Sequence, residues 1–411
     1  MGKLTNRARA KADYFWFIGS REWPVFVSAL GVLLGLVTLV PSAVGIVLSG
    51  VALALGVLTL TRDIRMLRGR WAAYEFAAIA APFPHTDVPP PASYPEARYL
   101  HLTGRGTALV SDAIDRALWT QRFSVEVAPD PYRLPAELKA TAPYVLPLRA
   151  HGRLLFNGKV VGMRGEPLPS VGHGAPIRLQ RTRFFDAQCS NELATLRIAR
   201  RDTDQVFDLR RHMMVDTAGR LHTLAESRLA DIVGVSTVAV TTDGCVLVVL
   251  QSNRNSASQS LLAPSGSGSL EPRDLDGDDL HDVVRAGMER ELCEETGLRR
   301  DEIVRTTITG FARWMDRGAK SEFFGLTELS VTRQDLVTRR PSRSERDFTA
   351  AMRFVEIDLA AYGRELAAGA DLPSLPALIT DSGSVPLLLA LRAAARWTVR
   401  AEPKEGDRVH P

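Results

Sequence analysis

The sequence predicts an α/β protein with an apolar helical hairpin near its N-terminus, and three observations lead to this prediction. Residues 23–61 contain no charged side chain. Residues 233–250 hold two apolar runs joined by Asp243-Gly244, which is typical of a β-hairpin. A helix that ends near Gly297 carries several carboxylates on one face. The length of 411 residues is sufficient for two or three domains.

Composition excludes several classes of protein. A hydrophobic content of 45% with 24% charged residues indicates folded cores rather than disorder. The net charge of +4 is small for this length and gives no indication of nucleic-acid binding, so no nucleic-acid partner is expected. Cys189, Cys245 and Cys293 form no C-x-x-C pair, so neither a zinc site nor a disulfide framework is predicted. Such a sparse set of cysteines fits a reducing compartment.

The charge-free run is too long for one membrane helix. At about 1.5 Å per residue, a single helix over residues 23–61 would be nearly twice as long as the roughly 30 Å hydrocarbon core of a bilayer. Pro41-Ser42 lies near the middle of the run and breaks the helix. We therefore expect a transmembrane hairpin with spans at about residues 25–40 and 43–60. A signal peptide is excluded because its apolar stretch is only about 7–15 residues long.

Basic residues flank both ends of this hairpin. Residues 1–22 form a basic N-terminal segment, and further arginines follow the second span. Because positive flanks favour the cytoplasmic side, both termini are expected in the cytoplasm, with the protein held in the inner cell membrane and residues 23–61 in the lipid bilayer. The flanking basic residues are Lys3, Arg7, Arg9, Lys11, Arg21, Arg62, Arg65, Arg68 and Arg70.

The middle of the chain gives structural signals but no chemical motif. Residues 62–95 read as a juxtamembrane helix, to about residue 81, and a proline-rich linker. Residues 96–228 form an α+β region of unknown role, with a helix expected at Ala108–Trp119 and a strand at Ile177–Phe185. Asn157-Gly158 between apolar runs predicts a β-hairpin.

Arginines are frequent in this middle region. They could contact lipid headgroups or a phosphorylated ligand, or they could form an ordinary solvated face, and we favour the solvated face. The residues concerned are Arg178, Arg181, Arg183, Arg197, Arg200, Arg201, Arg210 and Arg211.

The C-terminal third holds the residues that suggest chemistry. Glu291, Glu294 and Glu295 stand at i, i+3 and i+4, so they share one face of a helix within a sector of about 100°. Carboxylates this close repel one another, and the helix C-terminus disfavours them further. A hard divalent cation, Mg²⁺ or Mn²⁺, would relieve this repulsion. Arg290 can pair with Glu294 one turn later, and Gly297 suits the left-handed residue that ends a helix.

The complete string at residues 290–298, R-E-L-C-E-E-T-G-L, resembles the second half of the Nudix box, R-E-U-x-E-E-x-G-U with U aliphatic. Gly268 and Asp274 are similar to the Gly and Glu of its first half, and Glu271 takes a frequent acidic position between them. Asp274 replaces the usual Glu, and residues 275–282 form an insertion that we read as a longer loop. An alignment without the insertion would use Asp276 and Asp282 and would lose the glycine.

The resemblance covers residues 229–361 and implies a Nudix-type α/β/α sandwich around a mixed sheet. Residues 362–411 would add a C-terminal helix and a polar tail. The resemblance further implies that Glu291, Glu294 and Glu295 bind Mg²⁺ or Mn²⁺, and that the substrate is a nucleotide-type small molecule, a nucleoside diphosphate linked to another moiety. Water would attack phosphorus, and a nucleotide would leave.

Three glutamates are candidates for the general base. Glu295 belongs to the box itself, Glu322 precedes an expected strand at Phe323–Leu329, and Glu345 lies in an expected polar loop. For Glu322 and Glu345 an ordinary exposed glutamate is the competing interpretation. We favour Glu345 because a long loop between strands can close over a substrate.

Two functions follow from these patterns. The first is a membrane-tethered, metal-dependent Nudix hydrolase, an enzyme that cleaves phosphorus anhydrides. The alternative is a catalytically weak, nucleotide-sensing Nudix-fold module that signals at the membrane, and the Asp274 substitution and the stretched box motivate it. The presence of all three box carboxylates favours the enzyme. Loops outside the box select the substrate in this fold, and none of them here indicates a particular nucleotide.

Overall fold

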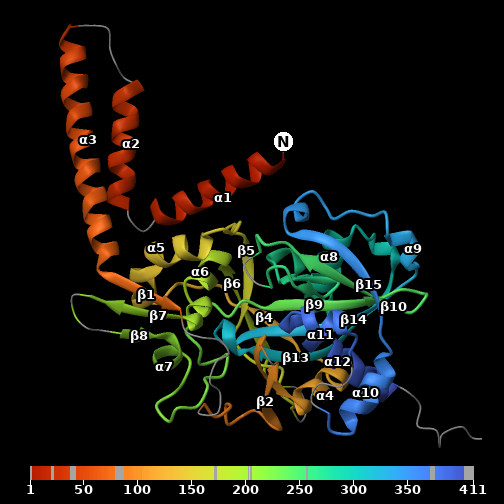
Figure 1. Ribbon diagram of the computed structural model, residues 1–411. Coiled ribbons are helices and arrows are strands. Elements are labelled where there is room, and N and C mark those ends of the chain that lie inside the picture. Colours follow the sequence, from red (N-terminus) through yellow and green to blue (C-terminus); the bar gives the residue numbers. More distant parts are fainter. Residues whose placement is uncertain are drawn as a thin grey trace, which may run out of the picture.

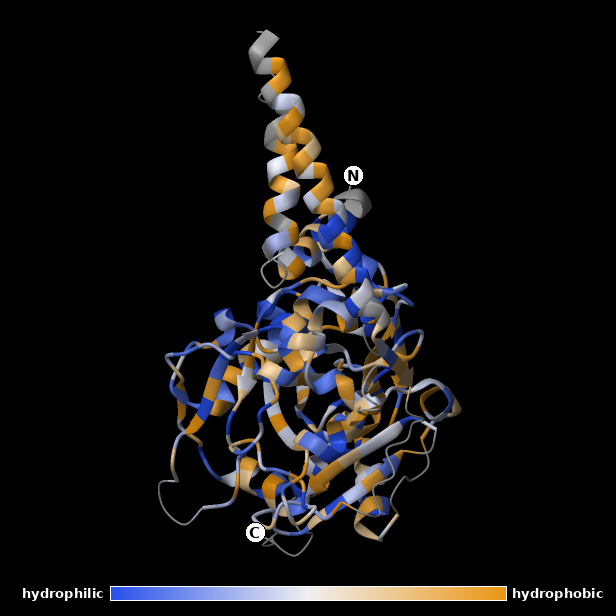
Figure 2. Cartoon of the chain, turned by 90° about the vertical axis from the view of Figure 1, so that its left-hand side faces the viewer, coloured by the Kyte–Doolittle hydropathy of each residue, from blue (hydrophilic) through white to orange (hydrophobic). Residues whose placement is uncertain are grey.

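A helical hairpin near the N-terminus projects from the layered body that the rest of the chain forms (Figure 1). The structure is a computed structural model that describes residues 2–19, 23–37, 43–78, 88–102, 104–170, 174–201, 203, 206–255, 258–370 and 375–401. α1 (Gly2–Gly19) lies against the body, and α2 (Trp23–Val37) and α3 (Ala43–Ala72) pack side by side and extend away from it. Apolar residues run along both extended helices (Figure 2).

The hairpin region agrees with the sequence prediction in part, because two helices, α2 and α3, lie where two helical spans were expected. Within the described residues, no helix combines the length and the apolar character that crossing a bilayer requires. The two membrane spans therefore stay a prediction, and Pro41-Ser42 lies outside the described residues. The helix expected to reach residue 81 ends at Ala72, because β1 (Tyr74–Ala78) follows and pairs with β7 (Leu196–Arg200). Most of the proline-rich linker, residues 79–87, lies outside the described residues.

A nine-stranded mixed sheet forms the centre of the body. Its strand order is β11-β10-β9-β14-β13-β3-β2, with β12 also paired to β9 and β15 to β10. The β9–β14 pair is parallel and the other pairs are antiparallel. The strands are β2 (Ala97–Leu102), β3 (Gly106–Ser111), β9 (Gly234–Val240), β10 (Cys245–Gln251), β11 (Leu262–Ala263), β12 (Gly266–Ser269), β13 (Ile303–Trp314), β14 (Lys320–Leu329) and β15 (Thr349–Glu356).

Helices cover both faces of this sheet. α8 (Leu280–Thr296) packs on one face, and α12 (Val385–Ala401) packs on the other together with α10 (Leu359–Ala367). Side chains alternate between the two faces along a strand, and neighbouring phenylalanines of β14 accordingly enter different cores. Phe323 packs with the α8 side, and Phe324 packs with the α12 side. The predicted α/β class is confirmed, and the layers are α/β/α.

The middle region shares the sheet with the C-terminal third. β3 pairs with β13 through Ala108–Val110, so β2 and β3 extend the same sheet. The helix expected from Ala108 is therefore wrong at its start, because the apolar residues before Asp112 form a buried strand. α4 (Asp112–Thr120) begins after Ser111, whose side chain accepts a hydrogen bond from the Ile114 backbone N–H.

The hairpin predicted at Asn157-Gly158 is also wrong. β5 (Lys159–Met163) begins just after this pair and joins β6 (Ile177–Arg183), while residues 154–158 are not in a strand. Tertiary contacts hold this segment instead: the Leu154 backbone N–H donates to the carbonyl of Arg254, and the Asn157 side chain accepts from the Phe185 backbone N–H. Tertiary context has overridden a local turn preference here.

Smaller elements complete the fold. There are two three-stranded sheets: β4-β6-β5 lies within the middle region, and β1-β7-β8 pairs that region with the segment that follows α3. The C-terminal segment holds three helices rather than one, and residues 402–411 lie outside the described residues. The remaining elements are β4 (Val125–Val127), β8 (Val206–Asp208), α5 (Ala136–Ala150), α6 (Phe184–Gln188), α7 (Leu209–Met213), α9 (Arg333–Leu336), α11 (Ala377–Ser382) and the 3₁₀ turns η1 (Asn191–Thr195), η2 (Pro272–Asp274), η3 (Arg300–Glu302), η4 (Met315–Arg317) and η5 (Glu345–Asp347).

Candidate active site

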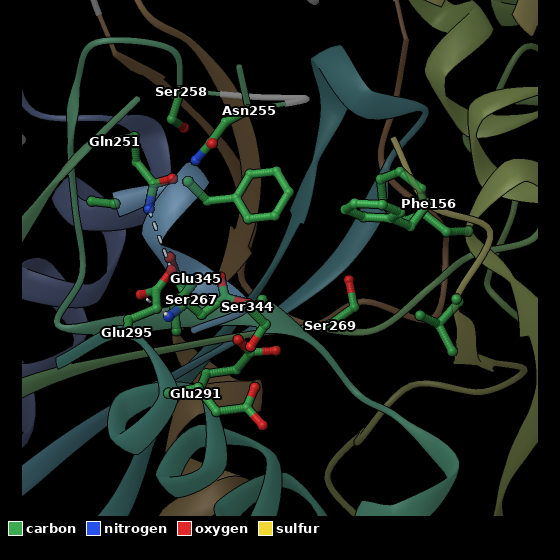
Figure 3. A pocket seen from close by; sticks show the side chains of 18 of the residues that line it. Phe156, Gln251, Asn255, Ser258, Ser267, Ser269, Glu291, Glu295, Ser344 and Glu345 are labelled. Carbon is green, nitrogen blue, oxygen red and sulfur yellow. Dashed lines mark hydrogen bonds between the residues drawn. The ribbon is translucent and has the colours of Figure 1, made fainter. Parts of the chain in front are cut away.

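A cavity of about 590 Å³ opens beside the C-terminal end of α8. Its walls come from α8, β12, β14 and the turn η5, and also from residues 154–160 of the middle region and from α1. Figure 3 shows Glu291, Glu295 and Glu345 gathered on one side and Phe156 on the opposite side. The acidic residues that line the cavity are Glu271, Glu291, Glu294, Glu295, Glu322 and Glu345.

Local sequence explains how α8 delivers its carboxylates. Asp279 caps the start of the helix by accepting from the His281 backbone N–H, and Gly297 ends it with a φ of 75°, a left-handed conformation that glycine adopts without strain. Between these caps, the last two turns place Glu291, Glu294 and Glu295 at the cavity. The fixed ends of the helix therefore fix the position of the acidic face.

Two glycines of β12 allow the helix to approach the sheet closely. A Cβ on Gly268 would lie 2.1 Å from Oε1 of Glu291, and a Cβ on Gly266 would lie 2.4 Å from the backbone nitrogen of Leu292. Real carbon atoms do not approach this closely, so neither position accepts a side chain without movement. Gly268 thus provides the space in which the Glu291 carboxylate stands.

Arg290 links the two segments that resemble the halves of the Nudix box, residues 268–274 and 290–298. Its guanidinium donates to both carboxylate oxygens of Asp274, from Nε to Oδ1 at 2.8 Å and from Nη2 to Oδ2 at 2.9 Å. It also donates to the carbonyl of Ser269 at 2.9 Å and, through Nη1, to Oε1 of Glu291 at 2.8 Å. A bidentate pair of this kind fixes both partners in orientation. The geometry therefore favours the alignment with Gly268 and Asp274 over the alternative with Asp282, which pairs with Arg285 instead.

The insertion before α8 packs against the middle region. The Val125 backbone N–H donates to the carbonyl of Asp278 at 2.9 Å, and the Leu280 N–H donates to the carbonyl of Phe123 at 2.8 Å. The prediction that all of residues 275–282 form a loop is wrong, because the last three residues make the first turn of α8. The inserted residues thus connect the start of α8 to the middle region.

Burial and mutual repulsion raise the pKa values of the clustered carboxylates. Burial raises the pKa of Glu291, and burial together with the charges of Glu291 and Glu345 raises that of Glu295 well above its usual range. Burial and repulsion from Glu291 and Glu294 raise the pKa of Glu345 to about 7. Glu295 also accepts hydrogen bonds from the Ser267 backbone N–H at 3.1 Å and from Gln251 at 3.4 Å. The cluster is thus short of positive charge.

Nearby guanidinium groups compensate this charge incompletely. Arg273 pairs with Glu271 at 2.7 Å and with Glu294 at 3.1 Å, and Arg290 reaches Glu294 at 3.5 Å. In the part of the chain that the structure describes, no group of three His, Cys, Asp or Glu side chains already stands in a geometry that would hold a metal ion. The donor set nevertheless fits Mg²⁺ or Mn²⁺, because all its donors are carboxylate oxygens that carry uncompensated charge.

The two downstream base candidates differ in their surroundings. Glu322 lies within β14 rather than before a strand, and both its oxygens are occupied, by Lys320 at 2.6 Å and by Ser236 at 2.9 Å. The Glu345 carboxylate has no hydrogen-bond or ion-pair partner among the described residues. A carboxylate with open oxygens can accept a proton more readily than one already paired, so the geometry favours Glu345.

Several lining residues were missed by sequence reasoning. Arg273 lies inside the first half of the box and could have been found there, whereas Phe156, Asn6 and Arg9 come from segments without a motif. Only the folding of the chain brings these three to the cavity.

Comparisons with known proteins give only distant likenesses. No family model matches the chain, and no curated protein matches it. It is similar to a solved Deinococcus radiodurans protein at 13% identity, over 44% of this chain and 97% of that one, with a TM-score of 0.26. It is also similar to the MutT protein of Methanosarcina mazei (16% identity, 41% and 94% covered, TM-score 0.25). For the Nudix hydrolase RenU of M. smegmatis the values are 13% identity, 42% and 86% covered, and a TM-score of 0.25. At these values the likenesses carry no argument about function.

Gly268→Ala should impair metal binding without unfolding the protein. The new Cβ would displace the Glu291 carboxylate, so Mn²⁺ affinity, measured by calorimetry, should fall by about tenfold. The melting temperature should stay near that of the wild type, because only the end of a flexible side chain must move. Gly266→Ala is the control: its Cβ meets backbone, so it should cost about 1–3 kcal/mol of unfolding free energy. Unchanged Mn²⁺ affinity in Gly268→Ala would contradict this account.

Glu345→Gln should stabilise the metal-free protein at alkaline pH. The pKa of Glu345 is raised from 4.5 to about 7, so the folded state holds a proton that the unfolded chain releases. This contribution to stability is fully present below the unfolded pKa and is lost as pH rises through about 7. The variant should therefore melt a few degrees above the wild type at about pH 8 and close to it at about pH 5. Glu356→Gln, at an exposed carboxylate of β15, should show no such difference. Equal melting temperatures of wild type and Glu345→Gln at alkaline pH would refute the assignment.

Proposed function

We propose that this chain is a Nudix-type hydrolase that uses Mg²⁺ or Mn²⁺ to cleave a nucleoside diphosphate linked to another moiety. One observation carries the proposal: Glu291, Glu294 and Glu295 meet at one cavity, next to Arg290 and Asp274, which hold the helix to the loop before it. Three carboxylates without full compensation form a binding site for a divalent ion and the phosphates it accompanies.

The clustered carboxylates and Arg290 have distinct roles in this reaction. Glu291, Glu294 and Glu295 would hold the divalent ion, which neutralises the diphosphate and polarises its phosphorus. The oxygen of a water molecule forms a bond to phosphorus while the bond from phosphorus to the leaving oxygen breaks. Glu345 accepts the proton that the water loses, because its carboxylate lines the cavity and has no hydrogen-bond or ion-pair partner among the described residues. Arg290 keeps Glu291 in place.

The alternative is a Nudix-fold module that senses a nucleotide without cleaving it. Its motivation is Asp274, which is one methylene shorter than the usual Glu. Asp274 still pairs with Arg290 through both of its oxygens, and this contact supports the enzyme over the sensor.

The proposal includes a membrane tether formed by α2 and α3. Support comes from apolar side chains that stand exposed along both helices: Val27, Leu30, Leu33, Ile46, Val47, Val51, Leu55, Val57 and Leu58. Exposed apolar side chains in this number favour contact with another apolar phase. The basic residues that flank the hairpin support an orientation with the globular body on the cytoplasmic side of the inner membrane.

A carbonate wash of isolated membranes tests the tether. The full-length protein should stay in the membrane pellet, because apolar contact with lipid tails does not depend on charge or salt. A shortened protein that begins at Arg62 should be released by the same wash. Release of the full-length protein would contradict the tether but would leave the enzymatic proposal untouched.

Replacement of the box carboxylates tests the enzyme. The full-length protein should release a nucleoside monophosphate from some nucleotide sugar, dinucleotide or nucleoside triphosphate in the presence of Mg²⁺ or Mn²⁺. Glu294→Gln combined with Glu295→Gln should reduce turnover by at least about a thousandfold without unfolding the protein, because the ion would lose two charged ligands. Asp282→Asn, on the first turn of the same helix, should retain activity.

Turnover by the double variant at the wild-type rate would rule the mechanism out. Tight nucleotide binding by the wild type without hydrolysis across the whole panel would favour the sensor. Loss of activity in Asp282→Asn would instead support the alignment that uses Asp276 and Asp282.

A further inference from the structure

α1 lies against the body rather than standing free of it (Figure 1), and two of its residues, Asn6 and Arg9, line the cavity. Asn6 donates from Nδ2 to Oδ2 of Asp347 at 2.9 Å, in the turn that carries Glu345. Further along the helix, Asp13 accepts a hydrogen bond from the Asn157 backbone N–H at 2.8 Å. Contacts spaced in this way along α1 come from one face of the helix.

Aromatic contacts complete the docking of α1. The guanidinium of Arg9 lies 5.2 Å from the ring centre of Phe156, and the ring of Phe17 meets that of Phe185 edge-on at 5.3 Å. Phe156 in turn contacts Phe348, three residues after Glu345, at 6.1 Å. α1 therefore reaches both the middle region and the turn that carries the proposed base.

Asn6 and Arg9 line the same cavity as the box carboxylates, although they lie near the opposite end of the sequence. Figure 3 places Phe156, the residue under Arg9, across the cavity from Gln251 and Glu295. A diphosphate held at the carboxylates would thus direct its attached moiety toward the wall that Phe156, Phe348 and Arg9 form.

Arg9 differs from the other cations of the cavity. Arg273 pairs with Glu271 and Glu294, Arg317 pairs with Glu192, and Lys320 pairs with Glu322. Within the described residues, Arg9 has no carboxylate partner, and its contact is with the face of Phe156. A guanidinium stacked on a ring keeps the donors at its edge available, and these donors match the two oxygens of a carboxylate or phosphate.

We propose that α1 completes the substrate pocket and that Arg9 binds an anionic group on the moiety beyond the diphosphate. The preferred substrates are then nucleoside diphosphates whose second moiety carries a carboxylate or a further phosphate. This inference rests on the proposed function for the position of the diphosphate.

A matched pair of ligands tests this proposal. UDP-glucuronate and UDP-glucose differ by one carboxylate on the moiety beyond the diphosphate. Binding is measured by calorimetry with Mg²⁺ on the full-length Glu345→Gln protein, in which the box carboxylates are intact. UDP-glucuronate should bind at least about tenfold more tightly, because a hydrogen bond to a charged group is stronger than a neutral one.

Substitutions of two arginines on the same helix provide the contrast. Arg9→Ala should reduce the ratio of the two affinities to about one. UDP-glucuronate should bind more weakly, and binding of UDP-glucose should be unchanged. Arg9→Lys should give an intermediate preference, because lysine keeps the charge and loses the two-pronged contact. Arg7→Ala, which removes the same charge from an exposed position of α1, should keep the full preference.

A preference that persists in Arg9→Ala, the absence of a preference in the parent protein, or the failure of both ligands to bind would each overturn the proposal. Turnover separates it from the proposed function. If the preference depends on Arg9 but the wild type hydrolyses neither ligand, the enzymatic proposal is wrong and the proposed role of Arg9 in binding stands. If the wild type hydrolyses both nucleotide sugars and binds them equally well, the enzymatic proposal stands and the proposed role of Arg9 is wrong.

Discussion

The contact between Arg290 and Asp274 is the constraint on which the candidate site depends. Asp274 lies before the insertion and Arg290 lies after it, so the pair closes a loop whose intervening residues are held by the middle region. The same guanidinium orients Glu291. Because Gly266 and Gly268 allow α8 to lie directly on β12, a small error in this contact would move the three carboxylates that α8 carries.

The cost of this arrangement is electrostatic. Close carboxylates at the end of a helix repel one another, and burial removes the water that would otherwise screen them. The raised pKa values of Glu291, Glu295 and Glu345 express this strain. Such a cluster lowers stability when no ion is bound, and this cost motivates the proposal that it binds a divalent ion.

Local patterns predicted the parts of the fold that local interactions determine. The β9–β10 hairpin, the end of α8 at Gly297 and the acidic face of that helix follow from turn chemistry and helical spacing. Predictions failed where contacts with residues distant in the sequence determine the local structure. Residues 106–111 form a strand because β13 pairs with them, and Asn157 bonds across the fold instead of forming a turn. The contribution of α1 to the cavity could not be read from the sequence, because Asn6 and Arg9 belong to no motif.

The two ends of the cavity are formed by segments that lie far apart in the sequence. Residues around 6–9 and 154–156 form one end together with Phe348, whereas Glu291, Glu294, Glu295 and Glu345 provide the carboxylates of the other. Substitutions in the first group can alter which molecules fit while leaving the ion-binding residues untouched. Relatives of this chain can therefore diverge in ligand preference through drift in regions that no motif search inspects, and conservation of the box alone would not reveal that divergence.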